Sequence, residues 1–445
     1  MKTFLPFFLL LITAVHSLQC NEDQQLSLLH FKKSLAYNSS VSSKLISWNS
    51  STNCCSWIGV TCSTNGSVIS LDISRESISS GIDNSSSLLD LQHLQSLNLA
   101  SNNFVGTFPK EFFQVPSLET LDLSDNLELQ GTLPEFPKNG SLRSLILRNT
   151  SFSGLLPNSL GNLEKLSTID IEYCSFSGSI PRSIGNLTQL VQFFMSMNYF
   201  KGPVPSFSRA KNLAVIDLSF NIDLAGPINS TRCENLTDLV NLNLGYNLLD
   251  GNIPSALFSL PLLYSLDLSN NQFSGPFHQI SNFSSCFLEF LDLSSNNLEG
   301  PIPISIRNVR GLQRLALGSN KLNGTFPISS LHQFRSLSYL DLSQNSLSLG
   351  LDATDFSYSS FPQFRNLYLA TVKLRSPFPE FLRNQSRLKY LDLSHTQIHG
   401  KIPNWIWRIN TLYLLNLSSN SLNLLEGPLL NPMPSSLRVL DLHSN

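Results

Sequence analysis

Residues 288–296 read L-E-F-L-D-L-S-S-N and contain the pattern that decides the fold, L-x-x-L-x-L-x-x-N. Leu291 and Leu293 are two residues apart, which is the period of a short β-strand with one buried face. Asn296 stands where the chain leaves this strand. Its amide can serve backbone donors and acceptors that a bend would otherwise leave unpaired. The stretch therefore predicts a strand followed by an inward turn.

The same pattern recurs in sixteen units from residue 68 to the end of the chain, at spacings of 23 to 27 residues. This period is that of a leucine-rich repeat. Stacked units place their strands side by side, about 4.8 Å apart, and predict a parallel sheet on the order of 70 Å long on the concave face of a curved solenoid. The positions equivalent to Asn296 are Glu76, Asn102, Asn126, Thr150, Cys174, Asn198, Asn221, Asn247, Asn271, Asn296, Asn320, Asn345, Val372, Thr396, Asn420 and Asn445.

Eleven of these sixteen positions carry Asn. Threonine and cysteine can make fewer hydrogen bonds than an amide at this position, and the side chain of Val372 can make none. The units that end at Cys174 and Val372 are therefore predicted to be local weak points of the stack.

A second motif, G-x-I/F/L-P, follows many of the Asn positions, as in residues 178–181, 251–254 and 400–403. Glycine permits turns that other residues resist, and proline fixes φ and removes a donor. This element resembles the plant-specific type of leucine-rich repeat. The resemblance implies a second short strand in each unit and a twisted superhelix, so the predicted fold class is an α/β leucine-rich repeat solenoid.

The first unit of a solenoid needs a cap over its core. Leu28, Phe31 and Leu35, with Leu26 and Leu29, form an apolar face of a predicted helix within residues 21–47, and Asn21 with Gln24 can cap its start. A cysteine-rich stretch follows, C-C-S-W-I-G-V-T-C at residues 54–62. Together they resemble the plant leucine-rich repeat amino-terminal domain. The cysteines by themselves allow three pairings, and the resemblance implies Cys20–Cys54 and Cys55–Cys62.

The chain begins with Lys2 and a mostly apolar run from Phe4 to Val15, the layout of a secretory signal peptide. The predicted organisation is a signal peptide at 1–17, the cap at 18–67 and the repeats at 68–445. Cys174 is expected to be a buried free thiol, and Cys233 and Cys286 are left unassigned. Entry into the secretory pathway makes thirteen Asn-x-Ser/Thr sequons candidate glycosylation sites: Asn38, Asn49, Asn65, Asn84, Asn139, Asn149, Asn186, Asn229, Asn235, Asn282, Asn323, Asn384 and Asn416.

Composition excludes several classes of function. The net charge is −2, from 29 basic and 31 acidic residues, so no basic field is available for nucleic acid or an anionic membrane surface. Outside the signal peptide no stretch approaches the ~18–20 apolar residues of a transmembrane helix. The sequence contains no G-x-S-x-G, phosphate-loop or H-E-x-x-H motif. We therefore expect no enzyme, no metal site and no cofactor.

The cap, repeats and G-x-I-P elements resemble plant cell-surface leucine-rich repeat receptors, and the cysteine doublet resembles receptor-like proteins, including the Verticillium wilt resistance type. That family implies an extracellular immune receptor for pathogen- or cell-wall-derived molecules, without a kinase of its own, that signals through partner receptor kinases. The family continues into further repeats, a transmembrane helix and a short tail. The chain is therefore expected to be the amino-terminal part of an ectodomain truncated within a repeat.

The expected location is the extracellular face of the plasma membrane through a carboxy-terminal helix outside this chain, or secretion if the chain is complete. The expected ligand is a protein, a peptide or an oligosaccharide. Two alternatives are a secreted polygalacturonase-inhibitor-like protein and the ectodomain of a leucine-rich repeat receptor kinase.

Ligand-contacting units should depart from the Leu-Asp-Leu-Ser background, because aromatic residues and arginine dominate binding surfaces. Two groups of residues do so. The first group, in adjacent units, is Arg143, Arg148, Glu172, Tyr173, Phe194, Met197 and Tyr199. The second group is Arg365, Tyr368, Lys389, Tyr390, His395 and Tyr413.

Overall fold

The computed structural model describes residues 19–82, 87–138, 140–228, 235–277, 287–350, 361–427 and 436–445. The predicted signal peptide, Cys233, Cys286 and the sequons at Asn84, Asn139, Asn229 and Asn282 lie outside these residues. The chain divides into two compact units, Met1–Gly131 and Thr132–Asn445.

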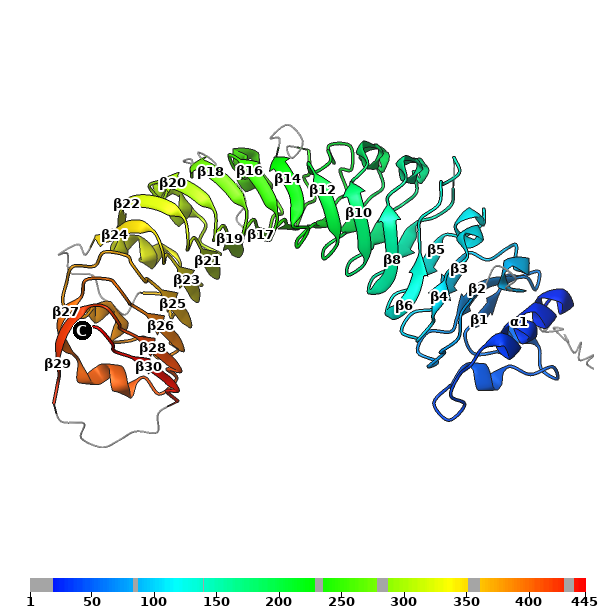
Figure 1. The fold of residues 1–445 in the computed structure, drawn as a ribbon, viewed down its shortest axis with the longest axis horizontal. Coiled ribbons are helices and arrows are strands. Elements are labelled where there is room, and N and C mark those ends of the chain that lie inside the picture. The colour runs from blue at the N-terminus through cyan, green and yellow to red at the C-terminus, as the bar shows by residue number, and fades with distance from the viewer. Residues whose placement is uncertain are drawn as a thin grey trace, which may run out of the picture. The chain divides into compact units, whose positions relative to one another are not determined.

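The first unit opens with helix α1 (Glu22–Ser34), as the apolar pattern predicts (Figure 1). The side chain of Asn21 caps its start by accepting a hydrogen bond from the Asp23 amide. Leu28 and Phe31 are buried, but Leu26 is 54% exposed. The predicted apolar face was therefore too wide, because the helix contacts the rest of the cap along one narrow stripe.

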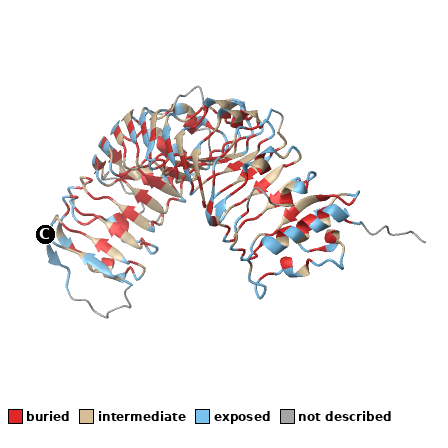
Figure 2. Ribbon diagram, turned by 45° about the vertical axis from the view of Figure 1, so that its right-hand side comes forward, coloured by how far each residue is buried: buried red, intermediate tan, exposed pale blue. Residues whose placement is uncertain are grey.

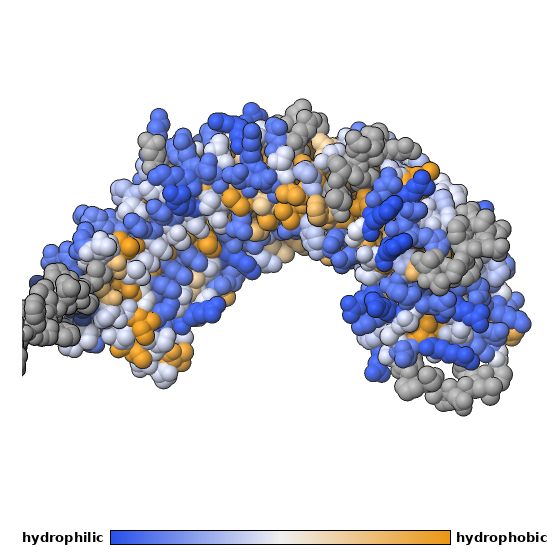
Figure 3. Space-filling model, turned by 180° about the vertical axis from the view of Figure 1, so that it is seen from behind, coloured by the Kyte–Doolittle hydropathy of each residue, from blue (hydrophilic) through white to orange (hydrophobic). Residues whose placement is uncertain are grey.

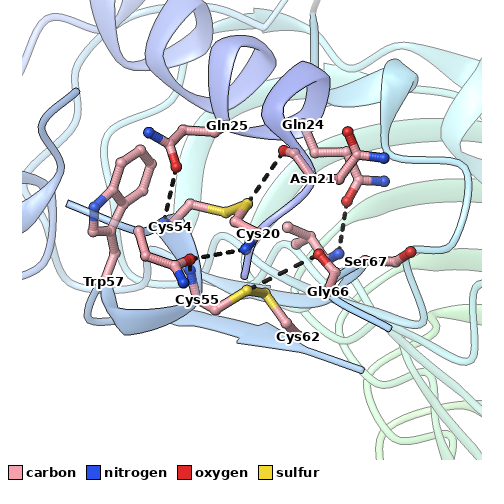
Figure 4. The surroundings of a disulfide bond; sticks show 12 residues. Cys20, Asn21, Gln24, Gln25, Cys54, Cys55, Trp57, Cys62, Gly66 and Ser67 are labelled. Atoms are coloured by element: carbon pink, nitrogen blue, oxygen red, sulfur yellow. Dashed lines mark hydrogen bonds between the residues drawn. A yellow bond between two sulfur atoms is a disulfide. The ribbon is translucent and has the colours of Figure 1, made fainter. Parts of the chain in front are cut away.

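The two disulfides have the pairing that the family resemblance implied, Cys20–Cys54 and Cys55–Cys62, with Cα–Cα distances of 5.6 and 5.5 Å (Figure 4). Gln25 connects the helix to this segment, since its Oε1 accepts a hydrogen bond from the Cys54 amide at 3.1 Å. These bonds fasten α1 to the short helices η1 (Leu45–Ser47) and η2 (Cys54–Ser56) and to the hairpin β1 (Val60–Cys62) and β2 (Val68–Asp72).

Strand β2 begins the repeats of the first unit. It pairs in parallel with β3 (Ser96–Asn98), and β3 pairs with β5 (Thr120–Asp122). The second strands β4 (Gly106–Thr107) and β6 (Asn126–Gly131) pair with each other, and the short helices are η3 (Ser87–Asp90) and η4 (Lys110–Gln114).

In the second unit each repeat contributes a three-residue strand to one parallel row (Figures 1 and 2). The middle residue of each strand is buried except in the last strand, where Leu440 is 46% exposed. The register joins equivalent residues of successive repeats, such as Ile169, Phe193 and Ile216. This row consists of β7 (Ser144–Ile146), β9 (Thr168–Asp170), β11 (Gln192–Phe194), β13 (Val215–Asp217), β15 (Asn241–Asn243), β17 (Ser265–Asp267), β19 (Phe290–Asp292), β21 (Arg314–Ala316), β23 (Tyr339–Asp341), β25 (Asn366–Tyr368), β26 (Tyr390–Asp392), β28 (Leu414–Asn416) and β30 (Val439–Asp441).

The second short strand implied by the plant-type motif is present. It begins just after the inward turn of most repeats, and these strands form a separate parallel row. The row consists of β8 (Thr150–Leu155), β10 (Ser175–Ser179), β12 (Tyr199–Gly202), β14 (Asp223–Pro227), β16 (Leu248–Gly251), β18 (Gln272–Pro276), β20 (Asn297–Gly300), β22 (Lys321–Pro327) and β24 (Ser346–Gly350), and β27 (His399–Ile402) pairs with β29 (Ser421–Leu425).

Short 3₁₀ helices follow many of the second strands, and each is preceded by proline, which fixes φ at the helix start. They are η5 (Asn158–Asn162), η6 (Arg182–Asn186), η8 (Ser255–Ser259), η9 (Ile304–Asn308), η10 (Ile328–Gln333), η12 (Glu380–Leu382) and η13 (Asn404–Arg408).

The asparagine at each inward turn makes the hydrogen bonds that its position predicts. Asn221 Nδ2 donates to the carbonyls of Leu218 and Ser219 in its own turn, at 3.0 and 3.3 Å, and to Met195 of the preceding repeat at 3.1 Å. Its Oδ1 accepts from the Phe200 amide at 3.1 Å. One buried side chain therefore serves four backbone groups and joins two repeats. Asn198, Asn271, Asn296, Asn320, Asn345 and Asn420 repeat the pattern.

We call the position of the asparagine at each inward turn the ladder position. Cysteine and valine at this position make fewer bonds than asparagine. Cys174 is a buried free thiol, as expected, and its Sγ lies 3.2 Å from the Leu147 carbonyl, although a thiol is a weak donor. Val372 is fully buried and its side chain has no polar atom. The predicted weak points at these two turns stay a prediction with this structural basis.

Glu76 occupies the first ladder position and has a different partner. It is 1% exposed, and its carboxylate accepts hydrogen bonds from the Ser42 hydroxyl and from the amides of Ser43, Lys44 and Leu45. Burial raises the pKa of Glu76, but these hydrogen bonds outweigh burial and leave the pKa below its ordinary value of 4.5. The ionised carboxylate therefore binds residues 42–45 of the cap, which we call the cap loop, to the first repeat.

We predict that Asn221→Ala lowers the free energy of unfolding by at least about 2 kcal/mol, because it leaves buried backbone groups without partners. Urea denaturation measures this. The control is Asn212→Ala at an exposed position, which should change stability by less than about 0.5 kcal/mol. Equal effects of the two substitutions would contradict the role of the ladder.

We also predict that Glu76→Gln destabilises the protein at neutral pH and that the difference from the wild type shrinks on acidification. The folded-state pKa of Glu76 is lowered, so its stabilisation is present above pH 4.5 and is lost as pH falls through the folded-state pKa. Thermal unfolding of both proteins between pH 7 and pH 3 measures the difference. A difference that is constant over this range would refute a role for the ionised carboxylate.

Candidate functional site

We call the strands of the row that contains β7 to β30 the inner strands. In most of them the first and third residues are only partly buried, and many end in an aspartate that is used within its own turn. Asp217 Oδ1 accepts hydrogen bonds from the amide and the hydroxyl of Ser219, at 2.9 and 2.7 Å. The same bonds join Asp122 to Ser124 and Asp341 to Ser343. The Leu-Asp-Leu-Ser background is therefore turn structure, and departures from it mark candidate contact residues.

The first predicted group lies on repeats that end at residues 150, 174 and 198, but the structure does not bring all of it together. Tyr173 and Tyr199 are 51% and 59% exposed at the turns. Arg148 is exposed on the preceding turn. Arg143 immediately precedes strand β7, so it lies at the end of that strand opposite to the turn that carries Arg148. Arg143 therefore belongs to a different edge of the sheet from the two tyrosines.

Three residues of the first group are half-buried: Glu172, Phe194 and Met197. Burial raises the pKa of Glu172, although the Ser196 hydroxyl donates a hydrogen bond to its Oε1 at 2.6 Å. Asp217 raises it further and Arg148 opposes this. The site thus offers one polar, partly desolvated carboxyl group beside exposed aromatic side chains.

The structure adds two residues that the sequence pattern missed. Tyr173, Met197, Phe220 and Tyr246 occupy the residue before the ladder position in consecutive repeats, and we call them the turn row. All four have positive φ, between 52° and 59°. The rings of Phe220 and Tyr246 stack at 4.1 Å with an interplanar angle of 10°. Phe220 and Tyr246 could have been found in the sequence, because each is a large residue directly before a ladder asparagine. The repeat pattern does not reveal that the backbone at this position has positive φ.

Most other turns carry smaller or polar residues at the same position of positive φ. Asparagine, aspartate and histidine tolerate this conformation better than other residues, and for bulky side chains it is unusual. The residues at these turns are Arg75, Ser101, Asp125, Asn149, Asn270, Ser295, Ser319, Gln344, Thr371, His395, Ser419 and Ser444.

The second predicted group is divided in the same way. Arg365, Lys389 and Tyr413 precede β25, β26 and β28, and the amide of each later residue donates to the carbonyl of the one before at 2.8 Å. The rings of Tyr390 and Tyr413 are 5.7 Å apart. His395 is exposed at a turn, on the far side of its strand, and so lies apart from the other members.

Tyr368 packs instead against residues that the sequence analysis overlooked. Its ring lies 5.7 Å from that of Tyr339. The guanidinium of Arg314 lies 3.7 Å from the centre of the Tyr339 ring and 2.9 Å from Asp292 Oδ2. Arg314 and Tyr339 occupy the same strand position as Tyr390, so the departure from the background was visible in the sequence.

Exposed apolar residues also gather at the start of β17 and β19. Leu262, Tyr264 and Phe287 are 43%, 37% and 55% exposed, and the Tyr264 ring lies 5.2 Å from that of Phe290. Sequence reasoning missed this patch because it compared residues only within the strands and turns.

The described sequons differ in accessibility. Asn416 lies on β28 and is half-buried. Its Nδ2 donates to Asp392 Oδ2 at 3.3 Å and its Oδ1 accepts from the Ser418 amide at 3.1 Å. Asn149 is also half-buried. The exposed sequons are Asn38, Asn49, Asn65, Asn186, Asn235, Asn323 and Asn384.

One cluster of metal-ligand type occurs in the described residues, formed by Cys20, Cys54, Cys55 and Cys62, whose sulfurs lie within 4.8 Å of one another. Both disulfides use these sulfurs. Among the described helices none is long and apolar enough to span a bilayer.

Comparison with known proteins identifies the parts of the chain. Residues 21–63 match the leucine rich repeat N-terminal domain. Two leucine rich repeat families match residues 66–127 and 362–422, and residues 141–163, 165–187, 262–283 and 287–309. The matched segments together cover more than half of the chain.

Among related proteins, Receptor-like protein 6 of Arabidopsis thaliana is 42% identical over 102 residues, which are 23% of this chain and 10% of that protein. Receptor-like protein Cf-9 of Solanum pimpinellifolium is 39% identical over 104 residues, 20% of this chain and 12% of that protein. The aligned parts therefore span a small fraction of these relatives.

A similar solved structure is that of the Arabidopsis receptor kinase HAESA in complex with the peptide hormone IDA and the co-receptor SERK1. It has a TM-score of 0.75 and 29% identity, and the match covers 90% of this chain and 70% of that one. The ectodomain of the Arabidopsis receptor kinase GASSHO1/SCHENGEN3 matches 89% of this chain and 56% of that one, with a TM-score of 0.60 and 27% identity. The chain therefore belongs to the leucine-rich repeat proteins, with an amino-terminal cap and repeats like those of plant receptor-like proteins.

Proposed function

We propose that the chain is the extracellular ligand-recognition part of a plant cell-surface receptor-like protein of the immune type, which signals through partner receptor kinases. Similarity to Cf-9 and to Receptor-like protein 6 supports the class. The similar HAESA structure is a complex of a receptor kinase with a peptide hormone and a co-receptor, which supports a peptide ligand here. Extracellular location is part of the same proposal, and the signal peptide predicted at residues 1–17 supports it.

The turn row carries this proposal. Tyr173 and Tyr246 are 51% and 45% exposed, and Met197 and Phe220 are half-buried. A left-handed conformation costs an L-residue on the order of 1–2 kcal/mol, and strained positions cluster at functional sites. The fold at these turns does not require an apolar residue, because the other repeats carry polar residues there. Large apolar side chains at four consecutive turns therefore point to an external partner that covers them.

The structure around the row suits binding. Three of the four turns are held by a ladder asparagine, Asn198, Asn221 or Asn247, and the turn of Tyr173 has the thiol of Cys174 instead. A surface fixed in this way loses little conformational freedom when a ligand binds. The adjacent Glu172 can accept a hydrogen bond from the ligand. We propose that a peptide or oligosaccharide lies along the turn row and buries its rings.

A second candidate is the ectodomain of a receptor kinase for a peptide hormone, favoured by the 90% coverage of this chain in the HAESA match. The reading frame of the gene distinguishes the two, because a receptor-like protein has a transmembrane helix and a short tail after its repeats, and a receptor kinase has a kinase domain.

We predict that the double substitution Tyr173→Ser and Met197→Asn abolishes ligand capture without lowering thermal stability. Both new residues suit positive φ, so the melting temperature should stay the same or rise. Serine is used at 173 because asparagine would form an Asn-x-Ser sequon with Cys174 and Ser175. The measurement is affinity capture from plant apoplastic fluid by the secreted protein, followed by mass spectrometry.

The matched control is Leu155→Asn with Ile304→Asn, which removes two apolar side chains that are 67% and 52% exposed elsewhere on the second unit. This control should retain the captured ligand. If the turn-row variant captures the same molecules as the wild type, or if its melting temperature falls by several degrees, the row is structural and the proposal is wrong.

A further inference from the structure

Four residues form a line along the second unit, each immediately before an inner strand: Arg365, Lys389, Tyr413 and Arg438. The Lys389 amide donates to the Arg365 carbonyl, the Tyr413 amide to the Lys389 carbonyl, and the Arg438 amide to the Tyr413 carbonyl, each at 2.8 Å. Neighbouring strands are about 4.8 Å apart, so the line is about 14 Å long. We call its three cations, Arg365, Lys389 and Arg438, the basic edge.

The basic edge has no acidic partner among the described residues, where every ion pair found involves other side chains. Arg314, by contrast, is paired with Asp292 at 2.9 Å. Arg365 and Arg438 are exposed and Lys389 is half-buried. On the face seen in Figure 3, hydrophilic residues dominate the carboxy-terminal end of the unit.

Carboxylates on the same strands lie at the opposite end and have local partners. Asp392 Oδ1 accepts from the Ser394 amide at 2.9 Å, and its Oδ2 accepts from Asn416. Asp441 pairs with His443 at 2.7 Å. The strands therefore present positive charge at one edge and partnered negative charge at the other, which leaves the basic edge free for an anionic ligand.

We infer that the basic edge binds an extended acidic segment of the peptide ligand, an inference that rests on the proposed function. Side chains on one face of an extended peptide recur every two residues, about 6.7 Å, so carboxylates at positions i, i+2 and i+4 span about 13 Å. That length matches the basic edge. Lys389 is one strand from Arg365 and two strands from Arg438, so it does not lie midway between them. Its long flexible side chain can still reach the middle carboxylate.

The position of Tyr413 favours a peptide over a uronate polymer. Tyr413 separates Lys389 from Arg438 and is 43% exposed, and its ring lies 5.7 Å from that of Tyr390. A polymer with a carboxylate on every sugar places charge against this tyrosine pair as well as against the cations. A peptide can place an uncharged residue there.

The test uses the secreted protein and a nine-residue synthetic peptide, acetylated and amidated, with glutamate at positions 3, 5 and 7 and serine or glycine elsewhere. Binding is measured by calorimetry at several salt concentrations. We expect the substitutions Arg365→Gln, Lys389→Gln and Arg438→Gln together to weaken binding about tenfold, since each exposed ion pair contributes a few-fold. They should also reduce its salt dependence.

The matched control has the same change in charge elsewhere on the unit: Arg182→Gln, Lys201→Gln and Arg307→Gln, all at exposed positions. It should bind the peptide like the wild type, and a peptide with glutamine in place of glutamate should not bind. Equal weakening by both triple variants, or no binding of the glutamate peptide to the wild type, overturns the inference. Tighter, edge-dependent binding of oligogalacturonate overturns the choice of a peptide.

Failure here is distinguishable from failure of the proposed function, because the turn-row substitutions leave the basic edge intact. If they abolish ligand capture while the glutamate peptide does not bind, the receptor proposal stands and the basic edge is excluded.

Discussion

The structure depends on one constraint, that the polar backbone groups at each inward turn are buried and must be hydrogen bonded. A ladder asparagine such as Asn221 meets it by serving four backbone groups in two repeats. The same side chain donates hydrogen bonds within its own turn and accepts one from an amide of the preceding repeat. The interaction that closes the turn therefore also holds two repeats together. The residue before the ladder position has positive φ in every repeat, whichever residue occupies that position.

This constraint separates the positions that the fold needs from those that it leaves free. Most strand leucines and most ladder residues are buried, and aspartates such as Asp217 are used within their own turns. Side chains of the turn row and of the edge before each inner strand are exposed or half-buried and take no part in the ladder, so they are available for recognition. At the first ladder position the side chain serves different backbone groups, because Glu76 accepts hydrogen bonds from amides of the cap loop.

Much of the fold could be predicted from the sequence, because each repeat contains its own strand, its own turn and often a glycine and proline after the turn, within about 24 residues. Less of the site could be predicted. Tyr173 and Tyr199 were found and are exposed, whereas Phe220, Tyr246 and the Arg314–Tyr339 contact were missed. The reason is that the repeats were read one at a time, while the contacts of a recognition surface join residues of different repeats.

The sequence alone determined the number of repeats, the buried face of each strand and the place of each turn, since these follow from a local period of leucines and asparagines. The tertiary structure alone decided which side chains are neighbours across strands. It separated Arg143 from Tyr173 and His395 from Lys389, and it aligned Arg365, Lys389 and Arg438 on one edge. Such neighbours depend on the register between strands and on the backbone conformation at the turns, which hydrogen bonds between repeats determine.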